Sequence, residues 1–184
     1  LDMEGLVVLH GKWCWEVRIS VVVLNNDGNV TGCSNLALLA SVRYARVNHV
    51  TVTEDAVRLI PFRARTPDTL QIVSKPVSVV YAIVGESEAT MLDPTYLEEK
   101  SSVGSLSITI NENLQVSAIA KNGRFELTID RVMEMTDRAG AQAAVLTKMV
   151  DDAVTVANSN WGSKKWIRVQ EQEVVNIDEP IFRE

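Results

Sequence analysis

Short runs in which apolar and polar residues alternate recur along the chain, and this period of two is typical of β-strands with one buried face. The longest run extends from Trp13 to Leu24, and every second residue from Trp13 to Val23 is aromatic or aliphatic. The residues from Asn25 to Asn29 then form a dense turn signal that ends the run. The pattern therefore predicts one long strand over Trp13–Leu24.

The end of this predicted strand is apolar on both faces, because Val21, Val22, Val23 and Leu24 follow one another. Such a run belongs inside a sheet, with neighbours on both sides and cover on both faces. The chain offers few strands that could pair with it. We therefore expect residues 1–65 to pack against other chains or to show an open apolar face, and residues 76–155 to form a closed lobe.

Further strands are predicted where apolar or alternating runs are bounded by turn residues. They are Leu6–Leu9, a hairpin of Val50–Val52 with Ala56–Phe62, a pair of Pro76–Val84 with Thr90–Leu92, and a hairpin of Ser105–Asn111 with Gln115–Lys121. The polar, proline-containing stretch 61–69 is the best internal boundary.

Two segments have apolar residues at helical spacing. One covers about Ser34–Arg46, and the other runs from an N-capping Thr128 to about Ala157. The buried stripe of the second helix, with its methionines as core packing, is expected to comprise Ile129, Val132, Met133, Ala139, Ala143, Leu146, Met149, Val150 and Ala153. Residues 158–184 are expected to form a docked tail or strand. This order of elements predicts an α+β fold with mixed or antiparallel sheets covered by helices.

The composition is that of a globular protein, since 46% of the 184 residues are hydrophobic and 23% are charged, with a net charge of −6. The charge is uneven: residues 1–75 carry 8 basic and 7 acidic side chains, and residues 76–184 carry 10 and 17. The first part could therefore present a basic face to nucleic-acid phosphates. A scattered set of solvated arginines explains the same numbers.

Targeting and metal-binding patterns do not stand out. No apolar run reaches the roughly 18 residues that are needed to cross a bilayer, and the first residues have no secretory signal. The chain starts with Leu1, so we expect its N-terminus to arise by cleavage or by the choice of the expressed segment. Cys14 and Cys33 are too few for a disulfide framework or a typical zinc site, which favours a reducing intracellular compartment.

Residue patterns that identify an enzyme are also lacking. No phosphate-binding loop, dinucleotide fingerprint, zinc-protease motif or nucleophile elbow is present in the sequence. His10 and His49 are far apart along the chain. The adjacent carboxylates Glu98 and Glu99 could serve acid–base or metal chemistry, although such pairs are usually solvated. The residues alone therefore leave the activity open.

Three segments, taken in order, resemble the RNase PH family. Trp15–Asn29 resembles the strand and Asp-Gly turn of that fold's second half. Val77–Val84, followed by Leu92–Thr95 and the acidic pair, resembles the later strand, Asp-Pro turn and acidic passage, and Gly104–Val132 continues in the same order. The resemblance implies an RNase PH-like fold, in which residues 1–68 are the C-terminal portion of the first, ribosomal protein S5 domain 2-like lobe. Residues 69–157 are then the RNase PH C-terminal lobe with its long helix, and residues 158–184 are a tail.

The chain departs from the catalytic pattern of this family at two places. Active members follow the Asp-Gly turn with Gly-Thr-Arg, whose backbone and arginine help to hold phosphate; these positions are Asn29, Val30 and Thr31 here. Active members also have one Asp in the acidic passage and a second Asp shortly after it, and these positions are Glu99 and Ser105. The resemblance therefore implies a degenerate phosphorolytic site with no metal and no cofactor.

The function that the resemblance implies is that of a non-catalytic structural subunit of the RNA exosome core ring, which supports 3′→5′ RNA processing and decay in the nucleus, nucleolus and cytoplasm. The implied partners are other RNase PH-like ring subunits, S1/KH-type cap subunits and RNA, and no membrane. Arg63 and Arg65 are the candidates for contacts with RNA phosphates. The resemblance also implies that members of the family carry further residues of the first lobe before the position of Leu1.

Two other functions remain open at this point. One is a phosphorolytic 3′→5′ exoribonuclease, which would use inorganic phosphate and release nucleoside diphosphates from RNA. The other is an unrelated α+β interaction module that shares only the order of strands, turns and helices with the family. Such a module would not co-purify with ring subunits.

Overall fold

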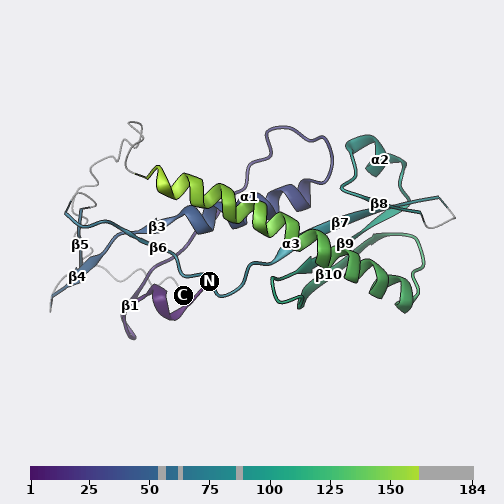
Figure 1. Ribbon diagram of the computed structural model, residues 1–184. Helices are drawn as coiled ribbons and strands as arrows, with labels where there is room; N and C mark the ends of the chain where they lie inside the picture. The colour runs from purple at the N-terminus through teal and green to yellow at the C-terminus, as the bar shows by residue number, and fades with distance from the viewer. Residues whose placement is uncertain (54–56, 62–63, 86–88, 162–184) are drawn as a thin grey trace.

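The computed structural model describes residues 1–53, 57–61, 64–85 and 89–161. In this part the molecule is elongated (Figure 1): a four-stranded sheet lies at one end and three two-stranded ladders lie toward the other. Helices α1 (Val30–Tyr44) and α3 (Ile129–Ser159) run between the two ends. The predicted α+β class is confirmed, and no helix in this part is both long and apolar enough to cross a membrane.

The four-stranded sheet is antiparallel throughout and has the strand order β10-β9-β7-β8. Its members are β7 (Val77–Val84), β8 (Ala89–Leu92), β9 (Gly104–Ile110) and β10 (Val116–Gly123). Both predicted strand pairs are confirmed to within a residue or two. Every side chain of β7 up to Ile83 is buried, because α1, α2 (Tyr96–Ser101) and α3 all contact this central strand.

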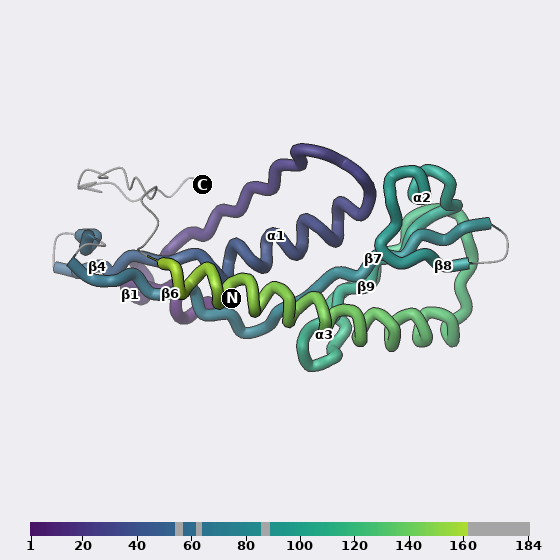
Figure 2. The backbone as a smooth tube through the Cα atoms, turned by 45° about the horizontal axis from the view of Figure 1, so that its top comes forward, coloured from purple at the N-terminus to yellow at the C-terminus, as the bar shows by residue number. Residues whose placement is uncertain are grey.

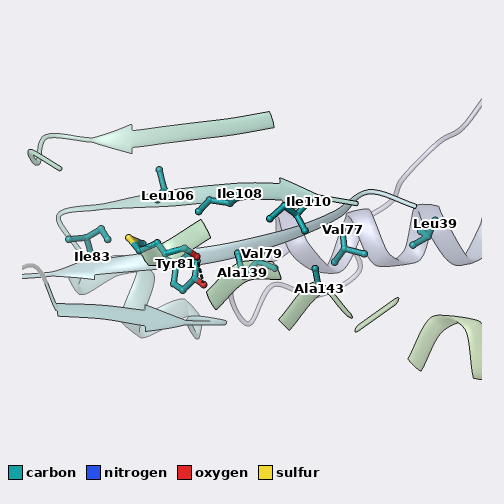
Figure 3. Close-up of a cluster of buried hydrophobic side chains, with 11 residues drawn as sticks. Leu39, Val77, Val79, Tyr81, Ile83, Leu106, Ile108, Ile110, Ala139 and Ala143 are labelled. Carbon is teal, nitrogen blue, oxygen red and sulfur yellow. Dashed lines mark hydrogen bonds between the residues drawn. The ribbon is translucent and has the colours of Figure 1, made fainter. Parts of the chain in front are cut away.

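The hydrophobic core lies where β7 and β9 meet α3 (Figure 3). It contains Leu39, Val77, Val79, Tyr81, Ile83, Leu106, Ile108, Ile110, Met135, Ala139 and Ala143. The Tyr81 hydroxyl, although buried, donates a hydrogen bond to the Met135 carbonyl oxygen at 3.1 Å. Burial raises the pKa of Tyr81 above its usual 10.0, and the positive charge of Arg138 opposes this rise.

The buried face of α3 differs from the predicted stripe. Thr128 caps the helix as expected, but the side chains of Ile129, Met133 and Met149 are 79%, 63% and 62% exposed. The prediction that these two methionines pack in the core is therefore wrong. The buried residues of α3 are mostly small, among them Ala139, Gly140 and Ala143, and Met135 is the methionine that is fully buried with them.

The three ladders are short. A 3-10 turn (Glu4–Leu6) leads into β1 (Val7–Leu9), which pairs with β2 (Trp13–Cys14), and β4 (Val50–Val52) pairs with β5 (Val57–Leu59). The strand predicted over Leu6–Leu9 and the predicted hairpin are thus confirmed, with the strand starting at Val7 and the second arm of the hairpin ending at Leu59. The third ladder, β3 (Arg46–Val47) with β6 (Asp68–Thr69), was not predicted, because two residues carry no periodicity.

The long strand predicted over Trp13–Leu24 is wrong beyond Cys14. Residues 15–23 belong to no strand, and Figures 1 and 2 show this purple segment arching alongside α1. Val22 is 76% exposed and Leu24 is 95% exposed. A strand needs a neighbour to accept its hydrogen bonds. The Trp15 amide still donates to the Leu6 carbonyl oxygen at 2.8 Å, but no strand pairs with residues 16–24 in the described part of the chain. The expected open apolar face is therefore present, on an extended segment instead of a sheet.

Charged side chains join α1 to α3 near the middle of the molecule. Asp151 of α3 forms ion pairs with Arg43 of α1 and with Lys75, whose Nζ lies 3.0 Å from Asp151 Oδ2. Beside them, the Arg46 guanidinium lies 4.3 Å from the centroid of the Trp161 ring. We call Asp151, Arg43 and Lys75 the Asp151 joint, because these residues hold the two helices and the segment before β7 together.

Candidate functional site at the start of α1

The turn before α1 is built from side-chain hydrogen bonds to the backbone. Asn26 Oδ1 accepts from the Gly28 amide at 3.0 Å. Asn29 has a φ of 45°, in the left-handed region that asparagine tolerates, and its Oδ1 accepts from the Gly32 amide at 3.1 Å. This cap starts α1 at Val30, before the predicted position Ser34, and so brings all three positions after the Asp-Gly turn to the helix N-terminus.

A second segment, 93–99, closes directly over this turn. The Tyr96 amide donates to the Asp27 carbonyl oxygen at 2.9 Å. A Cβ atom on Gly28, whose φ is 101°, would lie 2.2 Å from the Pro94 carbonyl oxygen. Only glycine fits this approach. The Asp-Gly turn therefore connects the two parts of the chain that the RNase PH resemblance predicts to form one site.

Asn29 makes the hydrogen bonds that join the start of α1 to the segment 93–99. Its amide donates to Glu99 Oε1 at 2.9 Å, and its Nδ2 donates to Asp93 Oδ1 at 2.6 Å. Glu98, the neighbouring carboxylate, has a different partner: it accepts from the Thr95 amide and hydroxyl and completes the capping box of α2. Glu99 thus faces the start of α1, while Glu98 stabilises the start of α2.

The structure brings together only some of the predicted site residues. Asn29 and Glu99 are in direct contact, with Val30 and Thr31 next to them in the first turn of α1. Ser105 lies in β9, opposite Ala82 of β7, and no hydrogen bond links it to Glu99 among the described contacts. Sequence reasoning missed Asp93 as a member of this site and missed helix α2, although the Thr95–Glu98 spacing is a capping-box signal.

The N-terminal end of α1 already has negatively charged side chains beside it. The N-terminal end of α1 carries a partial positive charge and attracts a negative group. Residues 29–31 add no cationic side chain, and two carboxylates meet this end: Glu99 accepts from the Asn29 amide and Asp93 accepts from the Asn29 side chain. Over the described residues, no group of three or more His, Cys, Asp or Glu is arranged to hold a metal ion.

Of the two candidates for RNA contact, Arg65 follows β5, away from this site (Figure 1). Arg63 falls outside the described residues. Arg65 is exposed in the turn after β5, where its amide donates to the Pro61 carbonyl oxygen at 3.3 Å. Its guanidinium is thus accessible to a phosphate, and no aromatic ring is paired with it among the described ring contacts.

A separate cavity of about 420 Å³ lies between β1 and the β3–β6 ladder. Asp2, Trp15, His49 and Asp68 are among its lining residues. His49 Nε2 lies 3.4 Å from Asp68 Oδ2 and 3.0 Å from the Thr66 carbonyl oxygen. The cavity lining includes neither cysteine, so this His–Asp pair has no thiol beside it to activate.

The sheet and its long helix define a known class of domain. Residues 75–142 match the profile of the 3' exoribonuclease family, domain 2. This part of the chain is therefore that domain, the RNase PH C-terminal lobe, as the sequence resemblance predicted. In a solved structure, the Archaeoglobus fulgidus exosome with RNA bound to the active site, one chain superposes with a TM-score of 0.54 at 28% identity, over 68% of this chain and 45% of that one.

The similarity reaches further in the RRP45 proteins. The chain is 32% identical over 168 residues to exosome complex component RRP45A of Arabidopsis thaliana, and the aligned region covers 90% of this chain and 55% of that protein. It is 30% identical over 154 residues to exosome complex component rrp45 of Schizosaccharomyces pombe, covering 84% and 53%. The chain spans about half the length of both relatives. Asp2–Val8 and Leu24–Asn29 resemble this same subunit in sequence, so the predicted kinship with its C-terminal part is confirmed.

Proposed function

We propose that this chain is the C-terminal part of a non-catalytic structural subunit of the RNA exosome core ring, which supports 3′→5′ RNA processing and decay. The observation that carries this proposal is its similarity, over most of its length, to exosome components of the RRP45 kind. The fold likeness to a chain of an archaeal exosome points the same way. The lobes 1–68 and 69–157 remain the division that we propose for this part of the subunit.

The non-catalytic role is supported by the residues at the site. Asn29, Val30 and Thr31 supply no cation that could hold phosphate, and Ser105 stands where the resemblance places a carboxylate. The Glu99 carboxylate is engaged with the Asn29 amide. Removing a metal ligand or a general acid typically lowers a rate by about 10²–10⁴-fold. Loss at both places argues for a subunit whose role is to complete the ring.

The partners that we propose are other RNase PH-like ring subunits, S1/KH-type cap subunits and RNA, in the nucleus, nucleolus and cytoplasm. RNA binding by this part of the subunit is expected to be weak and steeply salt-dependent, since exposed arginines such as Arg65 would contact phosphates. No base preference is expected, because no aromatic platform accompanies Arg65. Tight binding at physiological salt with a clear sequence preference would contradict this part of the proposal.

Co-purification tests the structural role. The tagged chain, co-expressed with RNase PH-like ring subunits, should elute with them in one complex by size exclusion. A double variant, Val22→Asp with Leu24→Asp, should weaken that complex, because it places charge on the open apolar segment that we expect another chain to cover. Leu97→Asp is the matched control, since Leu97 is 75% exposed on α2. A chain that never elutes with ring subunits would favour an unrelated interaction module.

An RNA degradation assay tests the enzymatic alternative. The purified chain should leave a poly(A) substrate intact, with or without inorganic phosphate. Phosphate-dependent release of nucleoside diphosphates would favour a phosphorolytic exoribonuclease. If that activity survived Glu99→Gln, the catalytic site would lie away from the start of α1.

A further inference from the structure

The C-terminal half of α3 exposes apolar side chains on the side that faces away from its buried residues. Val145, Met149 and Val156 are each more than half exposed. Ala143 and Val154 lie on the opposite side of the helix and are buried. At about 100° per residue, the three exposed side chains lie within about 40° of one another around the helix axis. They therefore form one apolar stripe along about three turns of α3.

Two oppositely charged residues lie beside this stripe. Lys148 and Asp152 are both exposed, and no ion pair in the described part of the chain involves either of them. They are four residues apart with the lysine first, which is the less favourable order for an ion pair within one helix. Both charges are therefore available to a surface outside the chain.

The order of these five residues is nearly the same from either end of the stripe, with the charges exchanged. Position 150 is the midpoint between Lys148 and Asp152, and Val145 and Val156 lie five and six residues from it on either side. A contact between identical chains about a twofold axis needs a surface that is complementary to itself. In a second α3 laid antiparallel across the stripe, with the axis at position 150, each Lys148 faces the Asp152 of the other copy. Each Val145 then lies close to the other Val156.

We propose that this stripe of α3 is the contact surface of a homodimer, in which a second copy of this chain packs antiparallel on it. Ala144 and Ala153, which are exposed at the two borders of the stripe, allow the two helices to approach closely. The contact involves only about three turns of each helix, so it falls short of the roughly 1,200 Å² that stable interfaces bury. We therefore expect a reversible dimer that forms at about 0.1–1 mM protein. The inference goes beyond the proposed function and does not depend on ring membership.

Analytical ultracentrifugation of the full chain tests this inference, over a concentration series up to about 1 mM at low ionic strength. The wild type should show a reversible equilibrium of monomer and dimer. Lys148→Glu alone and Asp152→Lys alone should each weaken dimerisation at least about tenfold, because each change places two pairs of like charges across the axis. An equimolar mixture of the two variants should recover the dimer, since every charge then faces its opposite.

Asp137→Lys is the matched control, because Asp137 is exposed on the same helix but lies more than three turns from position 150. It should dimerise as the wild type does. Met149→Asp, which places a charge in the apolar stripe, should lose the dimer, and it decides the question if circular dichroism shows that a charge variant of Lys148 or Asp152 is unfolded. The inference is overturned by a wild type that stays monomeric up to about 1 mM, or by folded Lys148, Asp152 or Met149 variants that dimerise like the wild type. A mixture that does not recover the dimer, or an equal loss in Asp137→Lys, would overturn it as well.

Discussion

Removing the charge of Asp151 should cost this chain a measurable part of its stability. Asp151 carries the only carboxylate of the Asp151 joint, and both Arg43 and Lys75 depend on it. The variant Asp151→Asn keeps the size and polarity of the side chain but leaves the two cations facing each other. The Arg43 guanidinium suffers most, because that side chain is only 17% exposed and water cannot fully replace its partner.

The size of the effect follows from this partial burial. Exposed ion pairs contribute about 0–1 kcal/mol, whereas removing one partner of a buried pair costs about 3–5 kcal/mol. Asp151 is 34% exposed, so the joint falls between these limits. We expect the variant to lower the free energy of unfolding by about 2 kcal/mol.

Urea denaturation followed by circular dichroism measures this difference. Glu134→Gln is the matched control on the same helix, because Glu134 also pairs with an arginine, Arg131, but is 53% exposed. It should cost less than about 0.5 kcal/mol, and its effect should vanish in 1 M salt while that of Asp151→Asn persists. If Asp151→Asn costs no more than Glu134→Gln, the joint does not hold α1 to α3.

Three further predictions concern the core and the site. Tyr81→Phe should lower the free energy of unfolding by about 1 kcal/mol at neutral pH, because it removes the hydrogen bond to the Met135 carbonyl oxygen. Because the pKa of Tyr81 is raised in the folded state, the unfolded state ionises first, so the stability of the wild type should fall as the pH rises above about 10, and that of the variant should fall less. Urea midpoints measured at neutral pH and at a pH above about 10 check both expectations. Met135→Ala should cost about 2–5 kcal/mol and Met133→Ala less than about 0.5 kcal/mol, and thermal unfolding that ranks them equally would refute the assigned face of α3. Gly28→Ala should lower the free energy of unfolding by about 2 kcal/mol or more, since its Cβ would meet the Pro94 carbonyl oxygen. A neutral effect in the same assay would show that the turn can shift to make room for the Cβ.

The sequence predicts elements well where the chain itself supplies the packing partner. The β7 strand reads as a continuous apolar run because helices cover it, and β9 alternates because every second residue from Leu106 to Ile110 is buried. The alternation of β10 has no such partner, since all of its residues are exposed. The same reasoning fails at residues 15–24, whose pattern is that of a strand inside a sheet. The pattern shows which residues of a segment can be buried, but a strand forms only where neighbouring segments are present to pair with it and cover it.

Features set by three-dimensional approach are harder to predict. The pattern of α3 identifies its start at Thr128 but not which of Met133 and Met135 meets Tyr81, since the two are only two residues apart and both are apolar. At the site, Asn29 and Glu99, two of the positions that the family pattern singles out, are in contact. The role of Asp93 depends on a left-handed backbone, with a φ of 55°, that has no clear signature in an Asp-Pro pair.

The number of residues between two contacts of helix α3 fixes the direction of one contact relative to the other. Gly140 approaches Leu114 at the tip of the β9–β10 hairpin, and Asp151 reaches Arg43 about three turns further on. An α-helix advances by about 100° for each residue, so inserting or deleting one residue between these two positions would turn the later contact away from α1. Substitutions in this stretch, apart from proline, leave the angle unchanged. The number of residues between Gly140 and Asp151 is therefore under stricter geometric control than the identity of most of them.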